Sequence, residues 1–373
     1  MRILEIHHNL NGGGSQHFMV DLSNELSKTD EVHIVTVKDD RIHPEICRFY
    51  YEDLKTNVKY HNLRCRNGFS LETEWRIFQF IKKTRPDVVH LHDASMPAFC
   101  AIALFMLSHQ CVFFQTIHSD LHNGYEGFFN KFILFGLLGR FRRIRFVSLS
   151  RTNYNQFTKA YPYADFTHID NGRAPLEKTE EFDNVKREIE GFKSSNDTRI
   201  IIHVGRCDAV KNQKLLVEAF VNISRKRHDI ELVIIGGKYD NSLGQELRRL
   251  ANEHVHFLGI KKNISDYMFC SDLFVLSSQY EGMPITLIEA SLAGLPAVST
   301  PVSGSLDIIK NGVNGFVSKD HSLEEYQNSL EDALMHIDVL KKNACDMQTK
   351  SPYTIKECAR KYRQLFLPNY KNQ

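Results

Sequence analysis

Short apolar runs alternate with amphipathic segments along the first half of the chain. Each run is too short for a helix and ends in polar or small residues, which is typical of buried strands. Between them lie segments such as Gln16–Leu26, whose apolar positions share one helical face. Alternating strands and helices favour a parallel sheet covered by helices. The strands predicted here are Arg2–Ile6, Val32–Val37, Asp87–Leu91, Val112–Ile117, Ile144–Leu149 and Phe166–Ile169.

The same alternation resumes after a turn at Asp170–Gly172 and a highly charged stretch at Lys178–Asp197. Such a break is typical of a connection between domains. A chain of 373 residues also exceeds what one hydrophobic core usually holds. The sequence therefore predicts an α/β protein with two doubly wound parallel-sheet domains. The strands expected in the second domain are Arg199–Val204, Leu232–Ile235, Val255–Leu258, Phe274–Leu276 and Ala297–Ser299.

The stretch Leu276–Pro301 carries the most specific pattern. A strand ends there, and a helix is expected to begin at Pro284, because proline is favoured in a first turn. Two acids, Glu281 and Glu289, bracket the start of this helix, and Glu289 lies ~7–8 Å along the axis from Pro284. The backbone N–H groups at the positive end of a helix bind phosphate without any side chain. In this chain they belong to Gly282, Met283, Ile285 and Thr286.

Glu281, the Gly-Met-Pro that follows it, and Glu289 together resemble the signature of the retaining, nucleotide-sugar-dependent glycosyltransferases of family GT4. The resemblance implies the GT-B fold, with two Rossmann-like domains facing a central cleft. It also implies that Glu289 holds the ribose hydroxyls and that Glu281 lies by the donor sugar. The backbone contacts to diphosphate and sugar are carried to Gly282, Met283, Pro284, Ile285 and Thr286.

The resemblance extends to other loops of the chain. Arg206 and Lys211, on the loop after a predicted strand, match the cations that clamp the donor diphosphate. His118 corresponds to a histidine that reaches the donor sugar, although a structural histidine is the alternative. Ile260 belongs to a segment whose backbone faces the nucleotide base. The expected domains are 1–171 on the acceptor side, 172–354 for the nucleotide sugar, and a helix at 355–373 that crosses back to the first domain.

A glycine-rich turn at Asn11–Ser15 separates the first strand from the first helix. It lacks the spacing of a Rossmann dinucleotide site or a P-loop. Glycines still allow a phosphate or sugar to approach the backbone closely. The resemblance gives this role to Gly13 and Gly14, and a plain flexible turn is the alternative.

His90 and His92 share one face of a predicted strand, a spacing that can hold a metal. The sequence shows no third ligand, so packing and hydrogen bonding are the stronger expectation. The chain also has no D-x-D motif, and the eight cysteines form no C-x-x-C pair. We therefore expect no metal and no cofactor other than the nucleotide diphosphate sugar itself, which is a co-substrate.

Residues 127–164 contain no acidic side chain but seven basic ones among many aromatic and aliphatic residues. This pattern predicts that 128–151 docks on an anionic membrane surface. The alternative is a core helix followed by a basic surface. No apolar run approaches the ~18 residues of a membrane span, and no signal peptide is recognised. We expect a cytoplasmic protein, peripheral on the cytoplasmic face of the membrane, and its net charge of +2 predicts no nucleic-acid partner.

These observations lead to one functional hypothesis. The protein is expected to be a retaining hexosyltransferase that moves a sugar from a nucleotide diphosphate sugar, with UDP favoured, to a hydroxyl of a lipid-linked or growing cell-surface glycan. The residues assigned to catalysis are His118, Glu281, Arg206 and Lys211. A GT-B nucleotide-sugar 2-epimerase and a non-catalytic nucleotide-sugar-binding protein are the alternatives.

Overall fold

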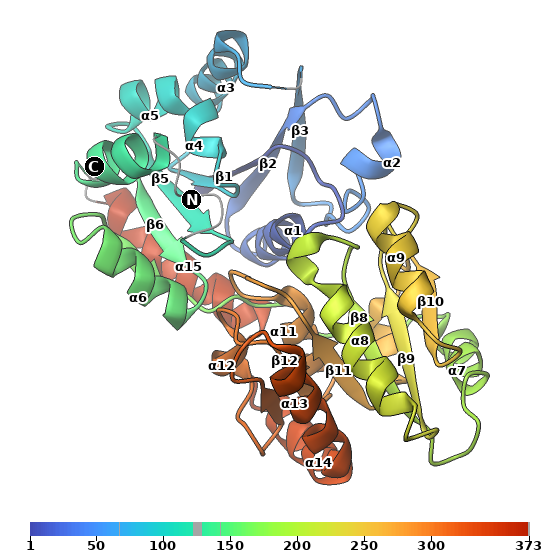
Figure 1. The fold of residues 1–373 in the computed structure, drawn as a ribbon. Coiled ribbons are helices and arrows are strands. Elements are labelled where there is room, and N and C mark those ends of the chain that lie inside the picture. The colour runs from blue at the N-terminus through green and yellow to red at the C-terminus, as the bar shows by residue number, and fades with distance from the viewer. Residues whose placement is uncertain (67, 122–128, 142, 372–373) are drawn as a thin grey trace. The chain divides into compact units, whose positions relative to one another are not determined.

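The computed structural model describes residues 1–66, 68–121, 129–141 and 143–371 (Figure 1). It divides into two compact units, each with its own parallel sheet. Unit 1 comprises Met1–Ala174 and Pro352–Gln373, and unit 2 comprises Pro175–Ser351. The C-terminal segment thus belongs to the same unit as the N-terminus, and the prediction of two doubly wound α/β domains is confirmed.

Unit 1 is built on a seven-stranded parallel sheet in the order β3-β2-β1-β4-β5-β6-β7. The strand order reverses between β1 and β4, which are neighbours within the sheet. From β1 the chain continues outward to β2 and β3, and from β4 it continues in the opposite direction to β5, β6 and β7. Strand β3 was not predicted, because most of its side chains are partly exposed and it lies at the sheet edge. The strands are β1 Arg2–His7, β2 Glu31–Lys38, β3 Lys59–Cys65, β4 Val88–Leu91, β5 Val112–Ile117, β6 Arg145–Ser148 and β7 Phe166–His168.

The helices of unit 1 include the last helix of the chain, α15, which packs against α1. Tyr362 on α15 is fully buried, and its hydroxyl lies 2.8 Å from Thr116 Oγ1 at the end of β5. Gly172 allows the chain to pass close to the start of α15, because a Cβ there would lie 2.6 Å from the Thr354 carbonyl oxygen. The helices are α1 Gly14–Leu26, α2 Pro44–Cys47, α3 Leu71–Thr84, α4 Met96–Phe99, α5 Ala101–Leu107, the π-helix η1 Phe129–Gly139, α6 Arg151–Ala160 and α15 Ile355–Lys371.

The segment predicted to dock on a membrane contains η1. Leu134 and Phe135 in its middle are fully buried, and Phe135 stacks on Tyr161 at 4.4 Å between ring centroids. One side of the segment therefore belongs to the core of unit 1, whereas Leu137 and Phe141 are exposed. Residues 128 and 142 of the predicted segment lie outside the described residues.

Unit 2 is built on a six-stranded parallel sheet in the order β10-β9-β8-β11-β12-β13. Here the order reverses between β8 and β11. Ligands of doubly wound sheets bind beyond the carboxyl ends of the strands at such a point. The strands are β8 Arg199–Val204, β9 Ile230–Ile235, β10 Val255–Gly259, β11 Leu273–Leu276, β12 Ala297–Ser299 and β13 Gly315–Val317.

The helix after β11 begins one residue later than predicted. Pro284 is its N-cap with an extended backbone, ψ 114°, so the first helical residue is Ile285. Gly294 ends the helix in the left-handed region, φ +72°, where glycine has no Cβ penalty. The helices of unit 2 are α7 Phe182–Glu190, the 3₁₀ helix η2 Ala209–Lys211, α8 Gln213–Ser224, α9 Ser242–Leu250, α10 Ile264–Phe269, α11 Ile285–Leu292, α12 Ser305–Ile308, α13 Leu323–Met335 and α14 Ile337–Gln348.

Candidate active site

The loop after β8 is held in one conformation by its own polar groups. Asp208 accepts a hydrogen bond from the Val210 backbone N–H at 3.1 Å and so caps η2. Gln213 donates to the Arg206 carbonyl oxygen at 2.8 Å. Only glycine fits at position 236, because a Cβ there would lie 2.0 Å from the Gly205 carbonyl oxygen. The loop is therefore fixed where the strand order reverses.

This loop brings Lys211 to the first acid of the sequence motif. Lys211 Nζ lies 2.6 Å from Glu281 Oε1, and Ser278 donates to the same oxygen at 2.7 Å. Ser277 donates to the Lys211 carbonyl oxygen at 2.8 Å, which joins the β8 loop to the end of β11. The two side chains are 29% and 14% exposed, so a ligand can reach the ion pair.

Arg206 stands further out on the same loop. Its side chain is 54% exposed, and its guanidinium group lies 2.9 Å from Asp208 Oδ2. Exposed ion pairs of this kind stabilise a fold by less than ~1 kcal/mol. The guanidinium group is thus held loosely, and forming contacts with an anion would cost little.

The start of α11, four residues after Glu281 in the sequence, presents backbone N–H groups. Its first intrahelical hydrogen bond runs from the Leu287 N–H to the Pro284 carbonyl oxygen at 3.1 Å. The N–H groups of Ile285 and Thr286 precede that bond and stand at the positive end of the helix dipole. Glu289 follows one turn later on the buried face of α11. The arrangement offers an anion two cations and a helix end.

His203, which the sequence analysis did not single out, supports this arrangement from inside β8. Its Nδ1 lies 3.0 Å from the Val275 carbonyl oxygen, and its Nε2 lies 3.4 Å from Gln213 Nε2. Burial lowers the pKa of His203 to about 4, so the ring is neutral at pH 7. A histidine within an apolar strand resembles core packing, which is why the sequence gives no signal for it.

Ile260, expected to face the nucleotide base, lies on the loop after β10 and is 67% exposed. It lies over the end of β9, because a Cβ on Gly237 would lie 3.1 Å from Ile260 Cδ1. Gly13 and Gly14 belong to unit 1, where Gly13 is the extended N-cap of α1 and Gly14 its first residue. The helix thus starts two residues before the predicted Gln16, and both glycines stand at its positive end.

His118 lies directly after β5. Titratable side chains from β4, from the residue that follows it, and from β1 lie close by. Its Nε2 lies 3.2 Å from His92 Nδ1, and His92 Nε2 lies 2.5 Å from Glu5 Oε2. His90 Nδ1 lies 2.8 Å from the same carboxylate oxygen. Glu5, His90 and His92 are fully buried, whereas His118 is partly exposed.

Glu5 corrects one expectation of the sequence analysis, which found no third group beside His90 and His92. Among the described residues, Glu5 on β1 brings a carboxylate to both rings, and the three candidate ligand atoms lie within 4.8 Å of one another. The sequence does not reveal this, because Glu5 is 85 residues from His90 and stands among Ile3, Leu4 and Ile6, which indicate only a buried strand.

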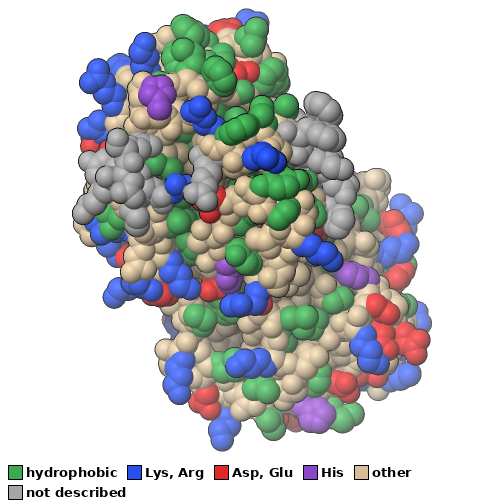
Figure 2. Space-filling model, turned by 90° about the vertical axis from the view of Figure 1, so that its left-hand side faces the viewer, with side chains coloured by type: hydrophobic (Ala, Val, Ile, Leu, Met, Phe, Trp, Pro, Cys, Tyr) green, Lys and Arg blue, Asp and Glu red, His purple; other side chains and the backbone are tan. Residues whose placement is uncertain are grey.

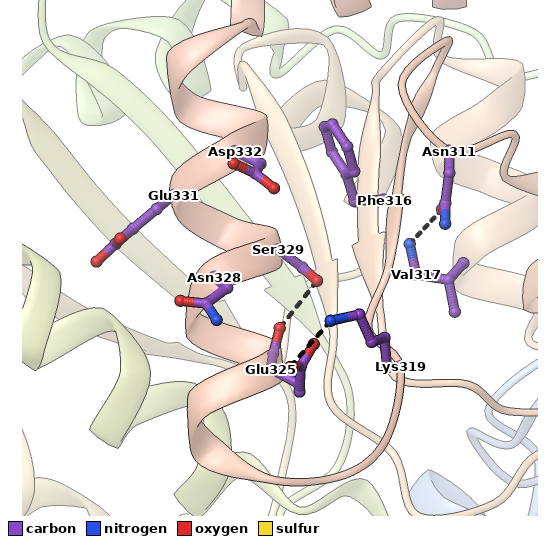
Figure 3. A pocket seen from close by; sticks show the side chains of 9 residues that line it. All are labelled: Asn311, Phe316, Val317, Lys319, Glu325, Asn328, Ser329, Glu331 and Asp332. Carbon is purple, nitrogen blue, oxygen red and sulfur yellow. Dashed lines mark hydrogen bonds and ion pairs between the residues drawn. The ribbon is translucent and has the colours of Figure 1, made fainter.

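A cavity of about 410 Å³ lies elsewhere in unit 2, beside β13 and the start of α13 (Figure 3). Lys319 and Glu325 form an ion pair at 3.2 Å across it. None of the predicted site residues lines this cavity. It is lined by Asn311, Phe316, Val317, Lys319, Glu325, Asn328, Ser329, Glu331 and Asp332.

Family comparisons match both units. Residues 184–344 match the family described as "Glycosyl transferases group 1", and residues 12–173 match "Glycosyltransferase Family 4". The N-acetyl-alpha-D-glucosaminyl L-malate synthase of Bacillus anthracis is 25% identical over 320 residues, 82% of this chain and 80% of that protein. The UDP-Gal:alpha-D-GlcNAc-diphosphoundecaprenol alpha-1,3-galactosyltransferase of Escherichia coli is 26% identical over 267 residues, 68% of each chain.

Other relatives are matched over part of their length. An uncharacterized glycosyltransferase of Methanocaldococcus jannaschii is 25% identical over 62% of this chain and 59% of its own. The match to the spore coat protein SA of Bacillus subtilis covers 45% of that protein. Among solved structures, Anabaena HepE in complex with UDP and glucose has a TM-score of 0.80 at 17% identity, covering 99% of this chain and all of that one. This likeness shows the GT-B fold.

Proposed function

Since the chain belongs to the group 1 glycosyltransferases of family 4, we propose that it is a retaining glycosyltransferase that uses a nucleotide diphosphate sugar, with UDP favoured. The observation that carries the proposal is the Lys211–Glu281 ion pair, fixed at 2.6 Å where the strand order of unit 2 reverses. The complex of HepE with UDP and glucose supports the choice of UDP.

The proposed reaction needs a site that stabilises a leaving diphosphate. The bond between the anomeric carbon and the β-phosphate oxygen breaks, and the acceptor oxygen bonds to the same face of that carbon. The acceptor proton passes to the departing phosphate oxygen. Arg206, Lys211 and the N–H groups at the start of α11 are preorganised for the charge that develops there. Two cations and a helix end can neutralise this charge, so we propose that no metal is required.

The remaining assignments follow the same proposal. Glu281, which shares its oxygen with Lys211 and Ser278, accepts hydroxyl hydrogen bonds from the donor sugar. Glu289 binds the ribose, Gly13 and Gly14 allow the backbone to approach the donor, and His118 contacts the sugar near the scissile bond.

The test is a transfer assay with a panel of UDP- and GDP-sugars and hydroxyl acceptors, followed by NMR of the anomeric proton. We expect one donor to give a product with the donor's anomeric configuration. An inverted product would contradict the retaining mechanism. An epimer formed without acceptor would favour the 2-epimerase alternative, and nucleotide-sugar binding without turnover would favour the non-catalytic one.

We further propose that unit 1 docks on anionic membranes and that the acceptor is a lipid-linked or growing cell-surface glycan. Lys and Arg side chains stand among exposed hydrophobic ones on the face in Figure 2. The end of η1 contributes Leu137 and Phe141, which are 48% and 64% exposed. Arg143 beyond it donates to Ser108 Oγ at 2.7 Å and so adjoins α5, where Phe105 is 78% exposed. No described helix is long and apolar enough to cross a membrane.

A further inference from the structure

A chain of hydrogen bonds crosses three adjacent strands of unit 1 and ends at His118. Glu5 on β1 contacts His92 after β4 at 2.5 Å, and His92 contacts His118 after β5 at 3.2 Å. The strands β1, β4 and β5 are neighbours in the sheet, so this chain runs along its carboxyl edge. Phe18 covers it with its ring 5.9 Å from His92 and 5.6 Å from His118.

Glu5, the first group in this chain of hydrogen bonds, determines which atom is the donor in each of them. A carboxylate can only accept hydrogen bonds, so the His92 nitrogen that faces Glu5 must carry a hydrogen. Burial opposes ionisation of Glu5, but the neighbouring rings of His90 and His92 and the hydrogen bond from His92 prevail and lower the pKa of Glu5 to about 2. Burial and the neighbouring His90 lower the pKa of His92 to about 4. At pH 7 the carboxylate is therefore ionised and His92 is neutral.

A neutral His92 with its hydrogen on Nε2 has a lone pair on Nδ1. That lone pair faces His118 Nε2, which must then donate. Burial and the nearby rings of His92, His7 and His90 lower the pKa of His118 well below its usual value, against the opposing charge of Asp93. His118 is thus neutral, and its hydrogen is used inside the protein.

We infer that Glu5 and His92 are positioning residues that hold His118 in the Nε2–H tautomer, so that its Nδ1 accepts a hydrogen bond from a hydroxyl group of the substrate. The part that concerns the substrate rests on the proposed function, whereas the tautomer itself does not. A hydroxyl of a sugar is the class of ligand group that such an acceptor fits, because a neutral ring cannot pair with a phosphate as a cation would.

The same distances argue for hydrogens rather than a metal between these groups. Ligands bound to zinc at ~2.0–2.2 Å in a tetrahedron stand more than ~3 Å from each other. Glu5 Oε2 lies 2.5 Å from His92 Nε2 and 2.8 Å from His90 Nδ1, which are hydrogen-bond and ion-pair distances.

The first experiment measures the tautomer directly in the whole protein labelled with ¹⁵N-histidine. Long-range ¹H–¹⁵N correlation distinguishes Nδ1–H from Nε2–H rings, and His118→Gln assigns the signal among the 18 histidines. We expect the Nε2–H form in the wild type. An Nδ1–H ring or an imidazolium at pH 7 would overturn the inference, whether or not the protein transfers sugar.

The second experiment changes Glu5→Gln, whose amide can face His92 with its NH₂ group. His92 can then lose the hydrogen on Nε2, and the Nδ1–H form of His118 should appear. One net hydrogen bond is worth about 1 kcal/mol, so kcat/KM for the sugar donor should fall about 5-fold. Affinity for free UDP should not change, since the cations and the helix end proposed to bind its phosphates are in unit 2 and Glu5 is in unit 1. An unchanged His118 signal in folded Glu5→Gln would contradict the inference.

Two further variants separate positioning from general stabilisation. His92→Asn places an amide oxygen near the position of Nδ1 and should keep the Nε2–H form of His118. In that background Glu5→Gln should have no further effect on the tautomer or on kcat/KM, because the connection runs through His92. Additive losses would show that both residues are merely structural. Glu231→Gln is the matched control, because Glu231 also lies between two histidines, His254 at 3.0 Å and His256 at 2.8 Å, in unit 2.

Discussion

The carboxyl edges of the two sheets carry different chemistry. In unit 1 the edge holds a buried carboxylate and neutral histidines that end at His118. In unit 2 it holds partly exposed charges, Lys211 with Glu281 and Arg206 with Asp208. Neutral acceptors suit hydroxyl groups, and exposed cations suit phosphates. Two similar sheets thus present groups that suit different classes of ligand.

Each unit also contains a glutamate between two histidines, and the two groups lie at different places along their strands. Glu5 is the fourth residue of β1 and lies near the carboxyl edge. Glu231 is the second residue of β9, and its partners His254 and His256 stand at the start of β10, at the opposite edge of the sheet. Ligands bind beyond the carboxyl ends. The buried group of unit 1 reaches that edge through His118, whereas the group of unit 2 lies at the opposite edge.

The largest effect should come from the cations of unit 2. Changing Lys211→Ala removes a charge contact that strengthens as the diphosphate departs, which typically costs ~10²–10³ in rate. Arg206→Ala should act in the same direction. Steady-state kcat measured with the preferred donor checks this.

Lys214→Ala is the matched control, because Lys214 is exposed and pairs with Glu246 at 2.8 Å on neighbouring helices. Its kcat should equal that of the wild type. A near-normal kcat in both Lys211→Ala and Arg206→Ala would remove the basis for assigning charge recognition to unit 2.

Much of this fold could be predicted from the sequence, since buried parallel strands have continuous apolar runs. Strands β3 and β13 and helix α14 were missed. Exposed and charged residues hide the pattern of β3 and α14, and β13 has only three residues. Lys211 and Glu281 were each identified from local motifs, but their 2.6 Å contact depends on how β8 and β11 pair. Glu5 was missed for the same reason: only the sheet brings it to His92.

A smaller effect is expected for binding to anionic membranes, which should depend on unit 1 alone. Arg140 lies 5.7 Å from the Tyr163 ring centroid, and Arg143, three residues later, is exposed. Each basic side chain contributes about 1 kcal/mol near an anionic surface, so Arg140→Gln with Arg143→Gln should weaken binding roughly 30-fold.

Sedimentation with anionic vesicles at low and physiological salt measures this binding. Binding should be weaker at physiological salt, because dissolved ions then screen charges over ~8–10 Å. The control is Lys214→Gln with Lys226→Gln in unit 2. It removes the same number of positive charges and should bind as the wild type does. A wild-type protein that ignores anionic vesicles at low salt would mean that η1 and its arginines are core and ordinary surface.

The neutral histidines of unit 1 predict that acid destabilises it. The folded pKa of His92 is about 4 and that of an unfolded histidine is ~6.5, so the unfolded chain binds more protons between these values. Stability is therefore lost as pH falls from about 6.5 to about 4, by about 1.4 kcal/mol per pH unit for this histidine. Urea unfolding followed by Trp75, the single tryptophan and part of α3 in unit 1, measures the effect.

His92→Asn should make the loss between pH 6.5 and 4.5 shallower by that amount. His203→Gln removes the corresponding buried histidine of unit 2, whose pKa is also about 4, and should not change the Trp75 transition if the units unfold separately. An equal pH dependence in the wild type and His92→Asn would show that His92 is already protonated in the folded protein.

The smallest effect should follow metal removal. Glu5, His90 and His92 form the cluster of described residues that could hold a metal, but their spacing of 2.5–2.8 Å fits shared hydrogens. In unit 2, Arg206 and Lys211 supply positive charge of the kind that a metal would bring to a diphosphate, and the carboxylates beside them, Asp208 and Glu281, are each paired with one of these cations. Dialysis against EDTA should therefore change neither kcat nor the Trp75 unfolding midpoint.

Loss of both, restored by Zn²⁺ and absent in Glu5→Gln, would place a structural metal in unit 1. Loss of kcat alone, restored by Mg²⁺ or Mn²⁺, would instead show that the cations of unit 2 do not suffice for the diphosphate.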